Sequence, residues 1–123
     1  MWKGAGGGAS RADCHERIAG APATDIGLVT AFVDKFILGD KDTGLQKMLT
    51  DKGIKTLVPV GVTSHNGVLF TSVSAALRGF HVVVPVDGMA GNNAYEDQAA
   101  DHTLTTSIVY KVTPTSIDVI KFH

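Results

Sequence analysis

The chain has no excess of positive charge, only one cysteine and no long apolar run. Each of these shortages excludes a class of partner or a structural feature. Lysine and arginine together number 11 against 12 aspartate and glutamate residues, so no basic surface is expected for nucleic acid. No apolar run approaches the roughly 20 residues that a membrane-spanning helix needs. A lone cysteine, Cys14, excludes an internal disulfide and favours a reducing, cytoplasmic location. We therefore expect neither nucleic acid nor a membrane among the partners.

The first part of the chain is rich in glycine and poor in core-forming side chains. Such a composition does not offset the entropy lost on ordering, so we predict a disordered arm over residues 1–24 and one folded domain over 25–123. The arm lacks the apolar segment of a secretory signal. Cys14 and His15 are adjacent, but a flexible arm supplies no preorganised base or oxyanion donors. We interpret Cys14 as a free thiol.

Short patterns follow the arm. An apolar run over 26–32 predicts a strand, and 33–39 predicts a turn anchored by aromatic side chains. Thr43 and Gln46 have the spacing of a capping box, so a helix is expected with Thr43 as its N-cap. Gly53 is typical of the position that follows a helix.

The central stretch of the chain carries the clearest pattern. An apolar run over 54–60 predicts a strand buried on both faces. A polar turn over 61–67, an amphipathic helix over 68–77 and a second strand over 82–86 complete a unit of roughly 30 residues, the length of a βαβ unit. Ligands of such units lie at the carboxyl ends of the strands, so the turn and the loop at 87–91 are expected on one rim. The helix N-terminus also directs its free N–H groups toward this rim.

The last third of the chain predicts one more helix and strand. The pattern over 94–105 indicates a helix whose inward side chains are Tyr95, Ala99, His102 and Leu104. Residues 107–112 indicate either a connection or a short strand, and 115–122 indicate a last strand. Strands and helices therefore alternate along the chain, which is typical of an α/β layer fold.

Six segments match a known family in order and spacing. They are VDKF at 33–36, DKGIKTL at 51–57, GVT at 61–63, VLFT at 68–71, AALRGF at 75–80 and VPVDGM at 84–89. Over about 25–122 the chain thus resembles the C-terminal part of the isochorismatase-like, or cysteine hydrolase, superfamily. The resemblance implies a Rossmann-like, three-layer α/β/α fold with a doubly wound parallel sheet of strand order 3-2-1-4-5-6. The two N-terminal strands of this sheet are expected to be missing here, so the sheet is a partial one.

The resemblance also implies a chemistry from which the sequence departs. Family enzymes hydrolyse an amide or a vinyl-ether or ester type of small molecule with an Asp, a Lys and a nucleophilic Cys. The Cys lies at a helix N-terminus, where the helix dipole lowers its pKa. Counted from Gly61, the Cys position is Gly67; the Lys position falls on Thr30 or Ala31, with Lys35 out of register. The segment that carries the Asp is not recognisable.

Two functions follow from this departure. The first is an isochorismatase-like hydrolase with weak or no activity, since losing one member of such a catalytic unit costs orders of magnitude in rate. The alternative is a non-catalytic α/β domain that binds a small ligand or oligomerises, or a truncated product. We expect no cofactor and no metal site, because no metal-ligand spacing is present.

Candidate ligand-binding residues lie on the predicted rim. Ser64 and His65 suggest either a replacement nucleophile and base, or a capping turn in which Ser64 or Asn66 binds the first helical N–H groups. For Asp87, capping of the next turn is favoured over a catalytic role. In the family, a peptide bond beside Thr63 is often cis, so Val62–Thr63 is expected to be unusual. The candidates are Thr63, Ser64, His65, Asn66, Gly67 and Asp87.

The missing strands have a consequence for assembly. Without them, the strand at 54–60 would present a bare apolar edge, and such edges pair with other chains. We therefore expect a homo-oligomer that forms through this edge, and a small molecule as the other partner.

Overall fold

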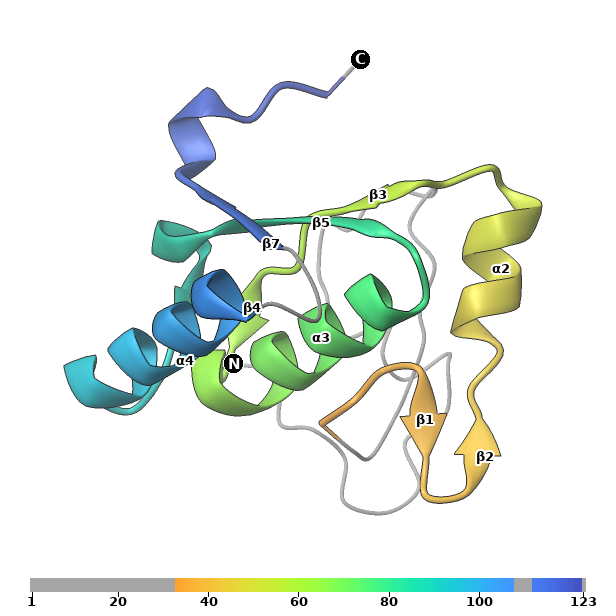
Figure 1. Cartoon of the computed structure of the whole chain (residues 1–123), viewed down its shortest axis with the longest axis horizontal. Helices are drawn as coiled ribbons and strands as arrows, with labels where there is room; N and C mark the ends of the chain where they lie inside the picture. Colours follow the sequence, from red (N-terminus) through yellow and green to blue (C-terminus); the bar gives the residue numbers. More distant parts are fainter. Residues whose placement is uncertain (1–32, 108–111, 123) are drawn as a thin grey trace, which may run out of the picture.

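The computed structural model describes residues 33–107 and 112–122, and Figure 1 shows the chain. Strands and helices alternate over most of this part. A π-helical turn at Ser64–Val68 runs directly into α3, and short 3-10 turns lie at Val86–Gly88 and Ile117–Val119. The strands and α-helices are β1 (Ile37–Leu38), β2 (Lys41–Asp42), α2 (Leu45–Asp51), β3 (Thr56–Leu57), β4 (Gly61–Val62), α3 (Leu69–Leu77), β5 (His81–Pro85), β6 (Met89–Ala90), α4 (Ala94–Thr106) and β7 (Val112–Thr115).

A parallel sheet of order β3-β5-β7 forms the centre of the described part. Leu57 is aligned with Val82, and Val84 with Pro114. The helices α3 and α4 lie side by side against one face of this sheet (Figure 1). Val82 and Val84 alternate along β5 and are each only 2% exposed, whereas Val83 between them is half-buried. The mixed α/β architecture with a parallel sheet confirms the predicted fold class.

The hydrophobic core lies between the sheet and these helices. Its buried members come from β5, β6, β7, the π-helical turn before α3, α3, α4 and the segment that precedes β1. They are Phe36, Val68, Ala75, Val82, Val84, Met89, Ala100, Leu104 and Val112. Small residues on α3 permit the close approach, because Ala75 and Ser72 are both fully buried against the neighbouring elements.

A second pair of parallel strands brings the predicted rim together. β4 pairs with β6, so that Gly61 is aligned with Met89 and Val62 with Ala90. Each strand of this pair follows a strand of the main sheet along the chain, β4 after β3 and β6 after β5. The two loops expected at one edge of the sheet are therefore hydrogen-bonded neighbours.

The strands are shorter than the sequence predicts. The run 54–60 forms only the two residues of β3, and Val60 is 59% exposed, so the prediction of a strand buried on both faces was wrong. Pro59 has no N–H for a ladder hydrogen bond, which accounts for a strand that ends before it. The predicted strand at 115–122 was also wrong: β7 ends at Thr115 and a 3-10 turn follows.

Of the two ends of α2, only the C-terminal one has the predicted residue at its cap. Gly44, with φ of 81°, is the N-cap of α2, one residue after the predicted Thr43; the Thr43 hydroxyl donates to the Lys35 carbonyl at 2.7 Å and accepts from the Leu45 N–H at 3.4 Å. At the other end, Gly53 and Ile54 donate to the carbonyls of Thr50 and Leu49, the double bond of a Schellman motif. The predicted glycine after the helix is thus confirmed.

Two predictions about helix faces and starts need correction. Tyr95 is 79% exposed and His102 is exposed, so these two predicted inward residues of α4 were wrong, whereas Leu104 is buried as predicted, together with Ala100. Helical structure before α3 begins at Ser64, earlier than the predicted 68. The polar residues of the predicted turn therefore lie in a helical turn.

Other predictions fall outside the described residues. These are the disordered arm over 1–24 with Cys14 and His15, the strand at 26–32, and the family's Lys position at Thr30 or Ala31.

Candidate functional site

The helical turn Ser64–Val68 forms the centre of the candidate site. Thr63, in extended conformation, is its N-cap and makes no side-chain capping hydrogen bond. The peptide bond between Val62 and Thr63 is cis, as the family resemblance led us to expect. The Thr63 carbonyl accepts hydrogen bonds from the N–H groups of Asn66 and Val68, at 3.1 and 3.3 Å. The backbone of the turn is thus fixed by its own hydrogen bonds.

A cavity of about 170 Å³ lies beside Gly67. Its described lining combines the end of the β3–β4 connection with the start of α3 and the segment before β1. The lining residues are Lys35, Pro59, Val60, Val62, Gly67, Val68 and Thr71. The wall is thus mostly apolar, with Lys35 and Thr71 as its polar members.

Gly67 leaves room on the cavity wall where a side chain would fit. A Cβ atom added there would lie 3.5 Å from the Val62 carbonyl oxygen and 4.0 Å from that of Val33, which are ordinary van der Waals distances. Gly67, which the resemblance assigns to the family's Cys position, therefore borders the cavity. The packing around Gly67 would therefore also accept a residue with a side chain.

Backbone hydrogen bonds hold Lys35 at this cavity. Its N–H donates to Thr71 Oγ1 at 3.2 Å, and its carbonyl accepts from Thr43 Oγ1 at 2.7 Å. Thr71 Oγ1 in turn donates to the Val33 carbonyl at 3.1 Å. Burial lowers the pKa of the Lys35 ammonium group, and the neighbouring carboxylate of Asp34 opposes that lowering. The segment 33–36 is thereby tied to α3 with a partly desolvated amine.

Ser64 is fully buried and belongs to a hydrogen-bonded cluster with α4. Its hydroxyl donates to Asp97 Oδ1 at 2.6 Å, and the Gly91 N–H donates to the same oxygen at 2.6 Å. The interpretation of Ser64 as a helix cap was therefore wrong, because its hydroxyl binds a carboxylate on another helix. This geometry also gives no support to a Ser64–His65 nucleophile and base.

The side chain of His65 contacts Glu96 of α4 and the side chain of Asn66. His65 Nδ1 lies 3.2 Å from Glu96 Oε2, an ion-pair distance, although the two groups are not aligned as a hydrogen bond. Asn66 Nδ2 lies 3.1 Å from His65 Nε2. Glu96 Oε2 also accepts from the backbone and side-chain N–H groups of Asn92, at 2.7 and 3.0 Å. The rim loop, the helical turn and α4 are thus linked by adjacent carboxylates.

Gly91 has little space around it. A Cβ atom there would lie 2.8 Å from Ser64 Oγ and 2.9 Å from Glu96 Cβ, closer than folded proteins permit. Only glycine allows the rim loop to approach both groups so closely. Unlike Gly67, Gly91 is required by the packing.

Asp87 lies on the rim loop but is turned toward the C-terminal segment. Its Oδ1 accepts a hydrogen bond from the Ile117 N–H at 2.9 Å. The expected capping role thus applies to a turn 30 residues further along the chain, not to the next one. Of the rim candidates, Gly67 borders the cavity, while Ser64 and Asp87 use their side chains to hold neighbouring elements.

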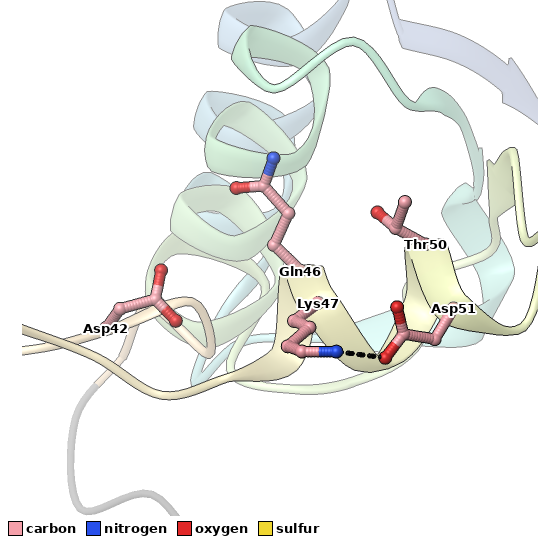
Figure 2. A pocket seen from close by; sticks show the side chains of 5 residues that line it. All are labelled: Asp42, Gln46, Lys47, Thr50 and Asp51. Carbon is pink, nitrogen blue, oxygen red and sulfur yellow. Dashed lines mark hydrogen bonds and ion pairs between the residues drawn. The ribbon is translucent and has the colours of Figure 1, made fainter.

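A second hollow, of about 400 Å³, lies at the surface of α2 (Figure 2). Its polar lining is already engaged in part: Lys47 pairs with Asp51 one turn away, and Asp42 Oδ1 accepts from the Gly44 N–H at 2.6 Å. Such an exposed pair is typical of a solvated helix surface. The cavity beside Gly67 is therefore the stronger candidate.

Two other kinds of feature are absent from residues 33–107 and 112–122. No three His, Cys, Asp or Glu side chains there are grouped to hold a metal ion. No helix of the same part is long and apolar enough to cross a bilayer.

Sequence reasoning missed the two carboxylates that organise the site. Asp97 and Glu96 were assigned to an ordinary helix, although Asn93 before them is a good N-cap and accepts from the Glu96 N–H at 3.0 Å. An Asn followed by two acidic residues in the first turn is a signal for the helix start. Nothing in the sequence indicates that these carboxylates reach Ser64 and His65, which lie about thirty residues earlier.

A parallel sheet flanked by helices, with a rim at its strand ends, is the arrangement of Rossmann-like α/β domains. Within that class the chain belongs to the isochorismatase family: the Isochorismatase domain matches residues 4–116. The match begins earlier than the resemblance noted from about residue 25. The comparison with curated proteins gives no match.

Solved structures of the same family share the fold. An isochorismatase-like hydrolase from Alkaliphilus metalliredigens is 25% identical, with a TM-score of 0.61 over 72% of this chain and 44% of that one. A nicotinamidase from Staphylococcus aureus is 28% identical, with a TM-score of 0.59 over 68% of this chain and 50% of that one. An isochorismatase family protein from Desulfovibrio vulgaris has a TM-score of 0.66 at 20% identity, over 76% of this chain and 46% of that one. The chain is thus matched to half or less of each of these structures.

Proposed function

We propose that the chain binds a small molecule in the cavity beside Gly67 and lacks the thiol-dependent hydrolysis of its family. The observation that carries this proposal is the position of Gly67, which borders the cavity at the family's Cys position and has no side chain. The described lining contains neither a thiol nor a carboxylate nor an imidazole. A further part of the proposal is a cytoplasmic location, which suits a chain with one cysteine.

The size of the cavity limits the ligand. Its volume of about 170 Å³ lies well below the roughly 300–1,000 Å³ of drug-sized pockets. A single small ring with one polar substituent is the upper limit of what fits. Nicotinamide is a reasonable first probe, because the similar protein from Staphylococcus aureus is a nicotinamidase.

The test measures binding and turnover separately. We expect nicotinamide to bind the purified chain in ligand-observed NMR, and the Gly67→Leu variant, which fills the cavity, to lose that binding. Release of ammonia from nicotinamide is expected at background level. Rapid ammonia release by the unaltered chain would refute the loss of hydrolysis and favour the alternative, an isochorismatase-like amide hydrolase that uses another nucleophile.

The Gly67→Cys variant makes this test sharper. A Cβ atom fits at Gly67, so the variant is expected to fold and to place a thiol at the cavity wall. Its modification by iodoacetamide can be followed separately from that of Cys14 by peptide mapping. If the new thiol is not modified in the folded chain and becomes reactive only in urea, Gly67 does not border an accessible cavity.

A further inference from the structure

Two backbone carbonyl groups lie beside the place on the cavity wall that a side chain of Gly67 would fill. A Cβ atom added there would lie 3.5 Å from the Val62 oxygen and 4.0 Å from the Val33 oxygen. Among the described residues, these oxygens are what it would meet outside its own helix and its chain neighbours. The wall at Gly67 therefore presents hydrogen-bond acceptors to whatever occupies this place.

The nearby hydroxyl group of the lining adds no free donor. Thr71 Oγ1 donates its proton to the Val33 carbonyl at 3.1 Å and accepts from the Lys35 N–H at 3.2 Å. A carbonyl oxygen has two lone pairs, so the Val33 oxygen keeps one acceptor position after binding Thr71. At this end of the cavity the donor in a hydrogen bond must come from the ligand.

Lys35 is the charged residue of the described lining, and a neighbouring carboxylate offsets its charge. Burial lowers the pKa of the Lys35 ammonium group, and the Asp34 carboxylate opposes that lowering. A negatively charged ligand would be repelled by Asp34 and by the two carbonyl oxygens. The lysine is thus not sufficient to make this wall a site for an anion.

The space beside Gly67 suits a small group such as an amino group. A methyl carbon at the Cβ position fits at ordinary van der Waals distances. A nitrogen moved a few tenths of an ångström from there toward Val62 would come within about 2.7–3.2 Å of its oxygen, which is hydrogen-bond distance. A group of the same shape without an N–H would cover the oxygen and leave it without a partner, which costs free energy.

We propose that the Gly67 end of the cavity is a subsite for an uncharged N–H donor. It selects a primary amide or an aromatic amine over the matching carboxylate, and over a group of the same shape that lacks N–H. This preference rests on the proposed function, since it names the class of ligand that the cavity takes.

The experiment compares three probes of nearly equal size by ligand-observed NMR titration of the full chain. Nicotinamide carries the amide, 3-acetylpyridine has a methyl group in place of the amino group, and nicotinate carries a carboxylate. We expect nicotinamide to bind about 2- to 10-fold more tightly than 3-acetylpyridine, the factor that one net hydrogen bond supplies. Nicotinate is expected to bind no more tightly than 3-acetylpyridine.

Two variants test whether this preference arises at Gly67. Gly67→Ala places a methyl group beside the two carbonyl oxygens, so the affinities of nicotinamide and 3-acetylpyridine are expected to become equal. Val60→Ala is the matched control, because Val60 lines the same cavity and is 59% exposed. It leaves the space at Gly67 as it is and is expected to keep the preference.

The outcomes separate this subsite from the proposed function. Equal affinities of nicotinamide and 3-acetylpyridine for the unaltered chain, or tighter binding of nicotinate, would overturn the subsite and leave binding in the cavity intact. A preference that survives in Gly67→Ala would also overturn it, because the donor would then be bound elsewhere. Lack of binding by all three probes would overturn both proposals. If Gly67→Ala fails to fold, the three affinities of the unaltered chain still decide.

Discussion

Ser64 and Ser72 are both fully buried, yet their hydroxyl groups meet different surroundings. Ser64 donates to Asp97 Oδ1 at 2.6 Å, while Ser72 Oγ has no hydrogen-bond partner among the described residues. Burying a hydroxyl without a partner costs free energy, and removing one from a charged partner costs more. The same substitution is therefore expected to have opposite effects at these positions.

We expect Ser72→Ala to leave the free energy of unfolding unchanged or to raise it by about 0.5–1 kcal/mol, because it removes an unsatisfied group from a helix. Ser64→Ala is expected to lower it by about 1–3 kcal/mol, because the Asp97 carboxylate loses a donor. Urea melts of both variants measure the difference. A Ser72→Ala variant less stable than Ser64→Ala would contradict the assignment of partners.

The Arg78 side chain contacts the hydrophobic core through the ring of Phe36. Its guanidinium carbon lies 4.8 Å above the ring centroid of Phe36, which is itself fully buried and 6.0 Å from the ring of Phe80. The guanidinium also donates to the Ser74 carbonyl at 3.1 Å and to the Ser74 hydroxyl. Arg78 thus joins the end of α3 to the segment before β1.

Replacing Arg78 by Ala is expected to lower the free energy of unfolding by about 1–2 kcal/mol, through loss of the cation–π contact and of apolar packing. Arg78→Lys should recover part of this, since an ammonium keeps the charge but not the planar stack. Lys47→Ala is the control, with an expected change of at most about 0.5 kcal/mol for an exposed pair. Equal melting temperatures for Arg78→Ala and the unaltered chain would rule out this role.

At the scale of elements, Asp87 connects the rim loop to the chain that follows β7. The turn Ile117–Val119 packs against the turn Val86–Gly88, and the Asp87 side chain accepts from the Ile117 N–H. Gly88 lies under this contact, because a Cβ atom there would come within 3.0 Å of Val60 and 2.9 Å of Pro85. The hydrogen bond thus holds the C-terminal segment against the rim.

We expect Asp87→Ala to increase the hydrogen-exchange rate of the Ile117 amide while the amides of β5 keep their protection. Asp87→Asn retains an acceptor oxygen and is expected to keep most of the Ile117 protection. Amide exchange followed by NMR measures both. Unchanged exchange at Ile117 in Asp87→Ala would show that the hydrogen bond does not hold this turn.

The order of these elements could be predicted from the sequence, but their ends often could not. The helix stops at Gly53 and Gly79 are local, because each glycine adopts positive φ and completes the hydrogen bonds of its own helix. The strand at 54–60 was predicted too long, since an apolar run does not reveal which of its residues have a neighbouring strand. The 3-10 turn at Ile117–Val119 depends on Asp87, which is distant in sequence.

In the candidate site, too, features set by neighbouring residues could be predicted from the sequence, whereas contacts between distant segments could not. The cis peptide at Val62–Thr63 was expected from a short motif of the family, and Gly67 is one of the candidates taken from the same turn. The partners of Ser64 and His65 are carboxylates on α4, so no local pattern indicates them. Lys35 was set aside as out of register with the family's Lys, although Thr71 and Thr43 anchor its backbone at the cavity.

At the scale of the whole molecule, the edge of the sheet at β3 bears on how the chain assembles with other copies. Of the described strands, β3 pairs only with β5. The His81 N–H donates to the Lys55 carbonyl at 2.9 Å, so Lys55 directs its carbonyl toward β5. Because alternate residues of a strand direct their backbone groups to opposite sides, Thr56 directs its own toward the other edge. An edge that no second described strand covers is a place where a strand of another chain can pair.

We propose that two copies of the chain pair through this edge, and we expect light scattering to give the mass of a dimer. Thr56→Pro removes the outward N–H without touching the bond between Lys55 and His81, and it is expected to give a monomer that keeps the α3 and α4 helix signal in circular dichroism. Thr56→Val keeps the N–H and is the matched control, expected to remain dimeric. A monodisperse monomer with a cooperative thermal transition in the unaltered chain would refute pairing at this edge. Dimers that persist in Thr56→Pro would place the interface elsewhere, because a strand added at β3 requires that donor.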